Sequence, residues 1–114
     1  TYVSDVVDAV LAVAESGLSG EAVNIGTGEP QTINHLVELL GASSTAYIPK
    51  RPGEPDVTQA DITRVTRATE WSPSVSFEDG VGRMLECASE WADAPVWTVD
   101  AITDATRDWF RHVV

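Results

Sequence analysis

Five short amphipathic segments, each preceded by a side chain that caps helices well, decide most of what this chain can fold into. The caps are Ser4, Thr32, Asp61, Ser76 and Thr98. Gly17 and Gly41 end the first two segments, because glycine readily takes the left-handed conformation that closes a helix. Ser76 together with Asp79 resembles a capping box and opens the clearest helical pattern. The sequence therefore predicts about five helices.

Three stretches between these segments favour short strands. Tyr2 and Val3 resemble the end of one strand, residues 22–26 a short buried strand, and residues 45–48 another that runs into a Pro-Gly turn. We therefore predict an α/β (α+β-like) fragment with about five helices and two or three strands, an incomplete α/β layer. A length of 114 residues fits one domain, residues 1–114, with a core over 2–91 and a helical C-terminal extension over 92–114.

The charge of the chain excludes some partners. Eighteen acidic residues against seven basic ones leave a net charge of −11, which makes nucleic acid and anionic membranes poor partners. No apolar run approaches the roughly 20 residues of a membrane span. The lone Cys87 cannot form an internal disulfide, so we expect a cytoplasmic protein. Lys50 is the only lysine, which is typical of a salt-adapted acidic surface but also of a GC-rich genome.

The strongest candidate for an anion site lies between Lys50 and Arg67. Four of the seven basic residues fall there with three acidic ones, so the segment carries +1 and the rest of the chain −12. Arg51 precedes a Pro-Gly turn, which would hold its guanidinium as a rigid fork suited to phosphate. Glu54 could accept hydrogen bonds from ribose hydroxyls. A surface turn with ordinary charges is the alternative interpretation.

Other chemical candidates are weaker. His35 and His112 have no cysteine or carboxylate at metal-ligand spacing, so each is interpreted as a surface or capping histidine and no metal site is predicted. Gly26-Thr27-Gly28 resembles half of a phosphate loop, but no GxGxxG or GKS/T pattern completes it. A tight turn after a strand explains that segment equally well.

Four segments in order resemble motifs of the extended short-chain dehydrogenases that act on nucleotide sugars. They are residues 2–9 (YVSDVVDA, similar to YVDDVVDA), 24–28 (NIGTG, similar to NIGxG), 51–61 (RPGEPDVTQAD, similar to RPGD…YAD) and 71–80 (WSPSVSFEDG, similar to GWxPxxxFEEG). In this family a Rossmann half holds NAD through a glycine-rich turn and supplies a Tyr-x-x-x-Lys pair. Neither feature occurs here, since Tyr2 is followed four residues later by Val6 and Tyr47 by Arg51.

The resemblance therefore implies the C-terminal, substrate-binding part of an NAD-dependent nucleotide-sugar 4-epimerase or 4,6-dehydratase, without its N-terminal Rossmann half. Such a part would be catalytically incomplete and would have no cofactor site of its own. The resemblance also implies that Arg51 binds the diphosphate and Glu54 the nucleoside ribose of the substrate. The expected partners are a nucleotide diphosphate sugar and either the missing Rossmann half or a second copy of the chain.

Some positions depart from the family pattern. Ser4 replaces the first Asp of the DD pair while Asp5 keeps the second, and Gln59 stands where many members carry Tyr. Residues 92–114 extend past the common core. Two alternatives stay open: a non-catalytic, truncated relative that acts as an oligomerising or interaction module, and an unrelated small α/β regulatory domain. The second leaves the four ordered motifs unexplained.

Overall fold

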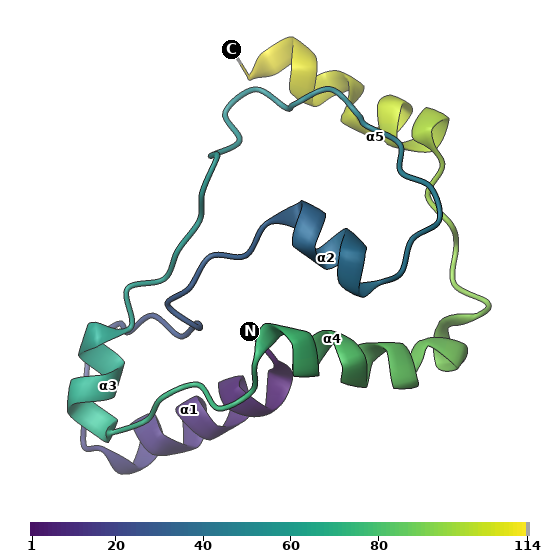
Figure 1. Ribbon diagram of the computed structural model, residues 1–114. Helices are drawn as coiled ribbons and strands as arrows, with labels where there is room; N and C mark the ends of the chain where they lie inside the picture. The colour runs from purple at the N-terminus through teal and green to yellow at the C-terminus, as the bar shows by residue number, and fades with distance from the viewer. Residues whose placement is uncertain (114) are drawn as a thin grey trace.

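The computed structural model describes residues 1–113 and is built of helices joined by long extended runs (Figure 1). The elements are α1 (Val3–Glu15), α2 (Ile33–Leu39), α3 (Thr63–Thr69), α4 (Phe77–Glu86), the short 3-10 helix η1 (Ala88–Trp91) and α5 (Val99–His112). The five α-helices follow the five predicted segments.

Three of the five predicted caps are confirmed. The side-chain oxygens of Thr32, Ser76 and Thr98 accept the backbone N–H three residues later, at 3.0–3.2 Å. The end of α2 is equally regular: Gly41, with φ +63°, donates to the carbonyl of Glu38, and the next amide donates to that of Val37. This is the double hydrogen bond of a Schellman motif, which explains why α2 stops there.

The other two caps differ by a residue or two. Helix α1 begins at Val3, directly after an extended Tyr2, so Ser4 lies inside the first turn and not before it. Asp61 precedes α3 by two residues, and its carboxylate accepts the amide N–H of Thr63 at 2.9 Å. Hydrogen bonding from Thr63, first from its side chain and then from its amide, holds the pKa of Asp61 below its ordinary value. Asp61 thus stabilises the start of α3 without occupying the N-cap position.

The predicted α/β fold is wrong, because no strand or sheet forms within residues 1–113. A strand needs a neighbouring backbone to complete its hydrogen-bond ladder. The segment 22–28 does run beside 58–61, but side chains join the two: Asn24 Nδ2 donates to the carbonyl of Asp61 at 3.3 Å, and Gln59 Nε2 to that of Gly28 at 2.6 Å. Residues 45–48 stay extended and exposed.

The hydrophobic core is small. Ala9 of α1, Val65 of α3 and Trp71 form its buried cluster, with α1 packed on α3. Five apolar side chains of α1 remain outside it, 37–65% exposed: Val3, Val6, Val7, Val10 and Leu11. We call this set the α1 stripe. Most of the apolar side chains of α1 therefore lie on the surface.

The chain as a whole is open. Its radius of gyration is 17.8 Å, against about 13 Å for a compact domain of this length. Its accessible surface is 9018 Å², about 3,000 Å² more than a folded monomer of this mass exposes. Figure 1 shows the cause: α1, α3 and α4 gather at one end, α5 lies at the other, and extended runs connect them.

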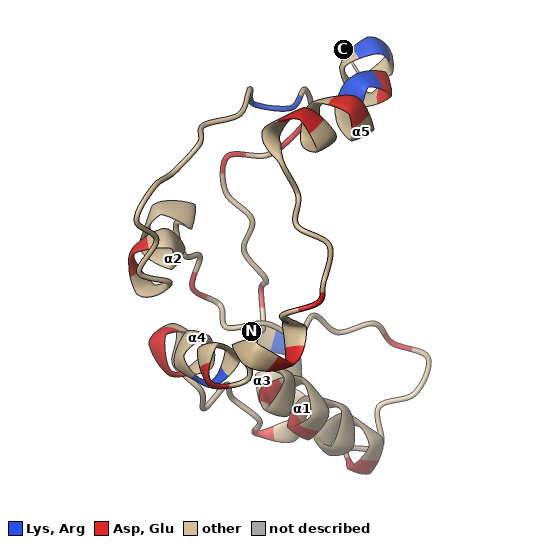
Figure 2. Cartoon of the chain, turned by 90° about the vertical axis from the view of Figure 1, so that its right-hand side faces the viewer, with Lys and Arg blue, Asp and Glu red and all other residues tan. Residues whose placement is uncertain are grey.

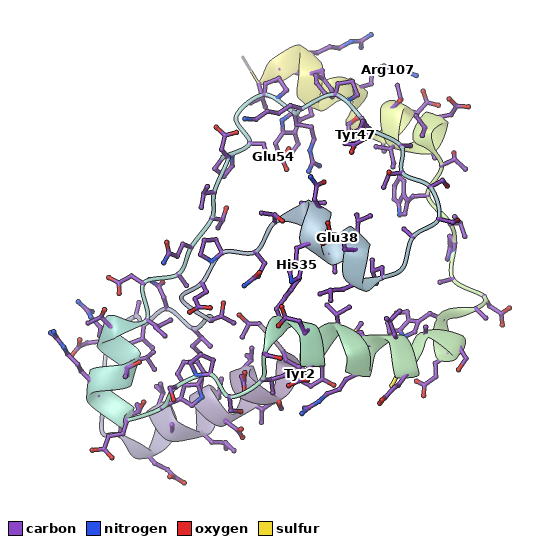
Figure 3. The ribbon with its side chains drawn as sticks, viewed as in Figure 1. Tyr2, His35, Glu38, Tyr47, Glu54 and Arg107 are labelled. Carbon is purple, nitrogen blue, oxygen red and sulfur yellow. The ribbon has the colours of Figure 1, made fainter. Side chains whose placement is uncertain are left out.

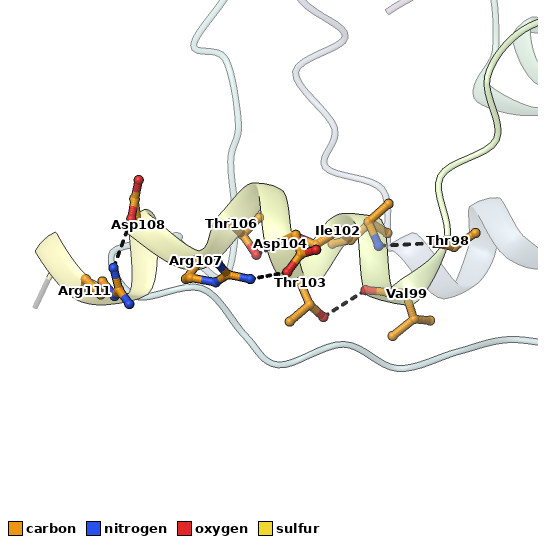
Figure 4. A network of polar contacts seen from close by, with 10 residues as sticks. Thr98, Val99, Ile102, Thr103, Asp104, Thr106, Arg107, Asp108 and Arg111 are labelled. Atoms are coloured by element: carbon orange, nitrogen blue, oxygen red, sulfur yellow. Dashed lines mark hydrogen bonds and ion pairs between the residues drawn. The ribbon is translucent and has the colours of Figure 1, made fainter.

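Helix α5 packs on a loop and on no other helix of residues 1–113. Most of its stabilising contacts are internal. Thr103 and Thr106 donate to carbonyls one turn earlier, and Arg107 pairs with Asp104 (Figure 4). Arg111 pairs with Asp108 at 3.6 Å. Salt bridges this exposed add little each, so the position of α5 depends on its contact with the loop at residues 51–53.

Candidate functional site

The family-like motifs converge on one cleft. This cavity has a volume of about 1060 Å³ and lies among the start of α1, the Gly26–Gly28 turn, α2, residues 58–60 and the start of α4. Its walls include residues from all four motif segments, which lie far apart in the sequence. We call this cavity the motif cleft.

Asp5 fastens α1 to the segment that leads into α4. Its side chain is 1% exposed, and its two carboxylate oxygens accept the Ser74 hydroxyl at 2.8 Å and the Val75 amide at 3.1 Å. Burial acts to raise the pKa of Asp5, but these hydrogen bonds and the positive charge of Arg83 outweigh it and lower the pKa. The second Asp of the motif is therefore a buried anchor that sets one wall of the cleft.

The Gly26–Gly28 turn approaches the 58–60 segment too closely for a side chain. A Cβ on Gly26 would lie 2.7 Å from the Cβ of Ala60, and Gly28 has φ +74°. The amide of Gln59 bonds the carbonyl of Gly28, so Gln59 ties the two walls together. The half phosphate loop suggested by the sequence is thus a tight turn packed on its neighbour.

The Tyr2 side chain, directly before α1, packs against α4. A Cβ on the buried Gly80 would lie 3.4 Å from its ring, so the glycine of the last motif makes room for the tyrosine of the first. The guanidinium carbon of Arg83 lies 5.1 Å from the centre of the same ring, within the range of a cation–π contact. Tyr2 of the first motif and Gly80 of the last are therefore in direct contact.

His35 joins α2 to α4. Its Nε2 lies 2.8 Å from Glu78 Oε1, its Nδ1 lies 3.8 Å from Glu38, and its ring faces Phe77 at 5.7 Å between centroids. Figure 3 shows His35 pointing from α2 toward α4. The hydrogen bond to Glu78 raises the pKa of His35 and lowers that of Glu78. The sequence indicated a surface or capping histidine, and no local signal shows a partner 43 residues away.

The groups that line the motif cleft suit a neutral, hydroxyl-rich ligand or a packed protein surface. Within the described residues the lining contains no Lys, Arg or His. Its polar groups are mainly hydroxyls and amides, such as Thr27, Gln31, Thr58 and Gln59, and the rest is largely apolar. An anion in this cleft would meet no cationic side chain of these residues.

Arg51 and Glu54 lie outside the motif cleft, on the loop beside α5. Arg51 Nη2 and Nε donate to the two carboxylate oxygens of Glu54, at 2.9 and 3.3 Å. This pairing raises the pKa of Arg51 and lowers that of Glu54. The two predicted site residues are therefore brought together, as partners of one another on a fixed turn.

The basic segment 50–67 does not form one patch. Lys50 and Arg51 lie near α5, where Lys50 pairs with Asp56, while Arg64 and Arg67 lie on α3 at the other end. Arg64 contacts Glu21 at 3.4 Å. Figure 2 shows the loop cations beside those of α5. The extended run from residue 55 to residue 62 separates the two groups.

Among residues 1–113, no three His, Cys, Asp or Glu side chains come near enough to hold a metal ion. Over the same residues, none of the helices has both the length and the apolar character needed to cross a membrane.

Comparisons with known proteins point to one group of enzymes. The chain is 36% identical over 87 residues to an uncharacterized UDP-glucose epimerase of Bacillus subtilis, covering 71% of this chain and 28% of that protein. It is 28% identical over 96 residues to a UDP-glucuronate 4-epimerase of Thermodesulfobacterium geofontis, covering 79% and 29%. It is 31% identical over 91 residues to a dTDP-glucose 4,6-dehydratase of Streptomyces niveus, covering 75% and 27%.

The chain spans less than a third of the length of these curated relatives. No family model matches the sequence, and no solved structure matches it. Over about three quarters of its length, the chain is thus related in sequence to nucleotide-sugar epimerases and dehydratases.

Proposed function

We propose that this chain is the nucleotide-sugar-binding part of an NAD-dependent epimerase or dehydratase and acts together with a cofactor-binding part. The observation that carries the proposal is the convergence of all four family-like segments on the motif cleft. The sequence similarity to enzymes of UDP- and dTDP-sugars supports the choice of ligand class. Hydroxyl and amide side chains in the cleft are suitable partners for sugar hydroxyls.

In this proposal Arg51 binds the diphosphate and Glu54 the ribose. The support is chemical: a guanidinium fixed by a turn presents a planar fork that matches phosphate oxygens. Glu54 holds one edge of that fork, and its carboxylate oxygens have lone pairs left to accept a ribose hydroxyl. The chain itself would supply no catalytic residue and no NAD site.

The open surface supports a second part of the same enzyme. The α1 stripe leaves five apolar side chains of α1 exposed beside the face that Ala9 buries, and the chain exposes about 3,000 Å² more than its mass predicts. Permanent assemblies typically bury about 2,000–5,000 Å² counted over both partners, or roughly 1,000–2,500 Å² on each. A dinucleotide-binding part packed on the α1 stripe would cover part of this surface.

The test uses the longest natural polypeptide that contains this chain, with UDP-glucose and dTDP-glucose as probes. Arg51→Ala should weaken binding of the better probe roughly ten- to hundredfold, because a charge-assisted contact is lost. Arg51→Lys should recover part of the affinity, since an ammonium cannot match the fork. Arg111→Ala, on α5 and equally cationic, is the matched control. Equal affinities for wild type and Arg51→Ala would refute the assignment.

The exposed α1 stripe also favours a second candidate, a non-catalytic module that associates through this helix. The two candidates differ in turnover. Conversion of either nucleotide sugar by the natural polypeptide supports the first, and binding or association without conversion supports the second.

A further inference from the structure

One side chain of α5 contacts the turn that carries Arg51 in two ways. The indole Nε1–H of Trp109 donates to the carbonyl of Pro52 at 2.8 Å. The centre of the same indole lies 5.5 Å from the guanidinium carbon of Arg51. Beside it, a Cβ on Gly53 would lie 3.1 Å from Val113 Cγ1, so the turn is seated closely against the end of α5. Figure 3 shows Glu54 on the loop that passes α5.

These contacts restrain the guanidinium in two directions. Glu54 bonds Nε and Nη2 within the plane of the group, and the indole of Trp109 lies against the guanidinium within cation–π range. Within residues 1–113, the hydrogen bonds of Arg51 side-chain nitrogens come from Nε and Nη2. The Nη1 edge is therefore the edge that a phosphate can reach without displacing a protein partner.

We propose that Trp109 is a positioning residue for Arg51, so that α5 belongs to the diphosphate site and is more than an extension of the core. The inference rests on the proposed function, because Arg51 is its binding residue. Arginine has many side-chain conformations, and each one that the turn and the indole exclude lowers the entropy lost on binding. Trp109 thus contributes to affinity without touching the ligand.

The experiment uses the 114-residue chain and follows the Arg51 Nε–Hε and Trp109 Nε1–H signals by NMR, first without ligand and then with UDP. Trp109→Phe keeps a ring but loses the donor, and Trp109→Leu loses both. Trp97→Leu, a two-thirds exposed tryptophan on the run before α5, is the control for loss of an indole. Helix content by circular dichroism shows that each variant is folded.

Without ligand, Trp109→Leu should shift the Arg51 Nε–Hε signal and speed its exchange with water, and Trp97→Leu should leave it in place. With UDP, Trp109→Leu should weaken binding about three- to tenfold and Trp109→Phe less. The double variant Arg51→Ala/Trp109→Leu should bind UDP no more weakly than Arg51→Ala alone, because a positioning residue has no effect once its target is gone.

The outcomes distinguish the positioning role of Trp109 from the proposed diphosphate site at Arg51. An unchanged Arg51 signal in Trp109→Leu, or losses in the two single variants that multiply in the double variant, refutes the positioning role and leaves the proposed function intact. UDP binding that Arg51→Ala does not weaken, or no UDP binding at millimolar concentration, refutes the proposed site, and the ligand-free signal still decides whether Trp109 orders Arg51.

Discussion

The buried carboxylate of Asp5 allows the sharpest test of how this chain is held together. It accepts one hydrogen bond on each oxygen, from the Ser74 hydroxyl and the Val75 amide, and these are contacts across about 70 residues of sequence. Asp5→Asn removes the charge and keeps the shape. The amide oxygen can still accept from Val75, and the hydroxyl of Ser74 can rotate to accept from the new NH₂ group.

The expected cost follows from the strength of these bonds. A hydrogen bond to a charged group contributes about 1.5–3 kcal/mol and a neutral one about 0.5–1.5. Asp5→Asn therefore exchanges two strong bonds for two weak ones, at about 1–3 kcal/mol, less what the protein regains by no longer burying a charge. Asp5→Ala loses both bonds, leaves a buried amide without a partner, and should cost about 3–5 kcal/mol.

The assay is urea unfolding followed by circular dichroism, with Asp8→Asn as control. Asp8 lies on the same helix and is exposed. Asp8→Asn removes the same charge as Asp5→Asn, and it should change the free energy of unfolding by no more than about 0.5 kcal/mol. Because the pKa of Asp5 is lowered from 3.8, the stabilisation it gives is complete above that pH and is lost as the pH falls through the folded value. The difference in the free energy of unfolding between wild type and Asp5→Asn should therefore become smaller as the pH is lowered through this range. If Asp5→Asn costs no more than Asp8→Asn at pH 7, the anchor is not energetically important.

Three other predictions concern charge and exposed surface. Because the pKa of His35 is raised from 6.5, its bond to Glu78 should stabilise the chain most below that pH and fade as the pH rises, so urea melts of His35→Gln should differ from wild type at pH 5 and approach it at pH 8–9. With a net charge of −11, the melting temperature should rise steeply from low salt to 1 M NaCl as the Debye length shortens to about 3 Å, and a flat series would leave genome composition as the reason for the single lysine. The exposed α1 stripe should cause the isolated chain to self-associate. Val7→Lys should abolish this association, and the control Asp8→Lys should not. Sedimentation that gives only monomer for the wild type at high concentration would contradict this prediction.

The features that could be predicted from the sequence are those decided by neighbours along the chain. The caps at Thr32, Ser76 and Thr98 bond an amide three residues away, so the pattern of residue types is enough to locate them. Gly41 ends α2 in a similarly local way, because its amide donates to a carbonyl only three residues earlier. Helices need only their own segment to complete their hydrogen bonds, which is why all five were found.

The features that escaped prediction depend on distant partners. Residues 22–26 have the composition of a buried strand, but a strand also needs a backbone beside it, and here the neighbouring segment offers side-chain contacts. The partners of Asp5 and His35 lie about 70 and 43 residues away, beyond any local pattern. The family resemblance singled out Arg51 and Glu54, while Trp109, 58 positions after Arg51, carries no motif that would connect it with the turn.

Helix α1 links the openness of this fold to its proposed role. Amphipathic reasoning expects one apolar face on a surface helix, yet α1 is apolar on two: Ala9 packs against the α3 side and the α1 stripe faces outward. A helix of that kind is built to lie between two layers, and residues 1–113 provide one of them. A partner that covers the α1 stripe binds only the folded state and stabilises it by mass action. At a partner concentration one hundred times the dissociation constant, this stabilisation is about 2.7 kcal/mol. The stability of the chain and its association therefore depend on the same interaction. A substitution in the α1 stripe should change the free energy of unfolding and the affinity of association in proportion. A substitution at Asp5 should lower the stability and leave the contact surface unchanged.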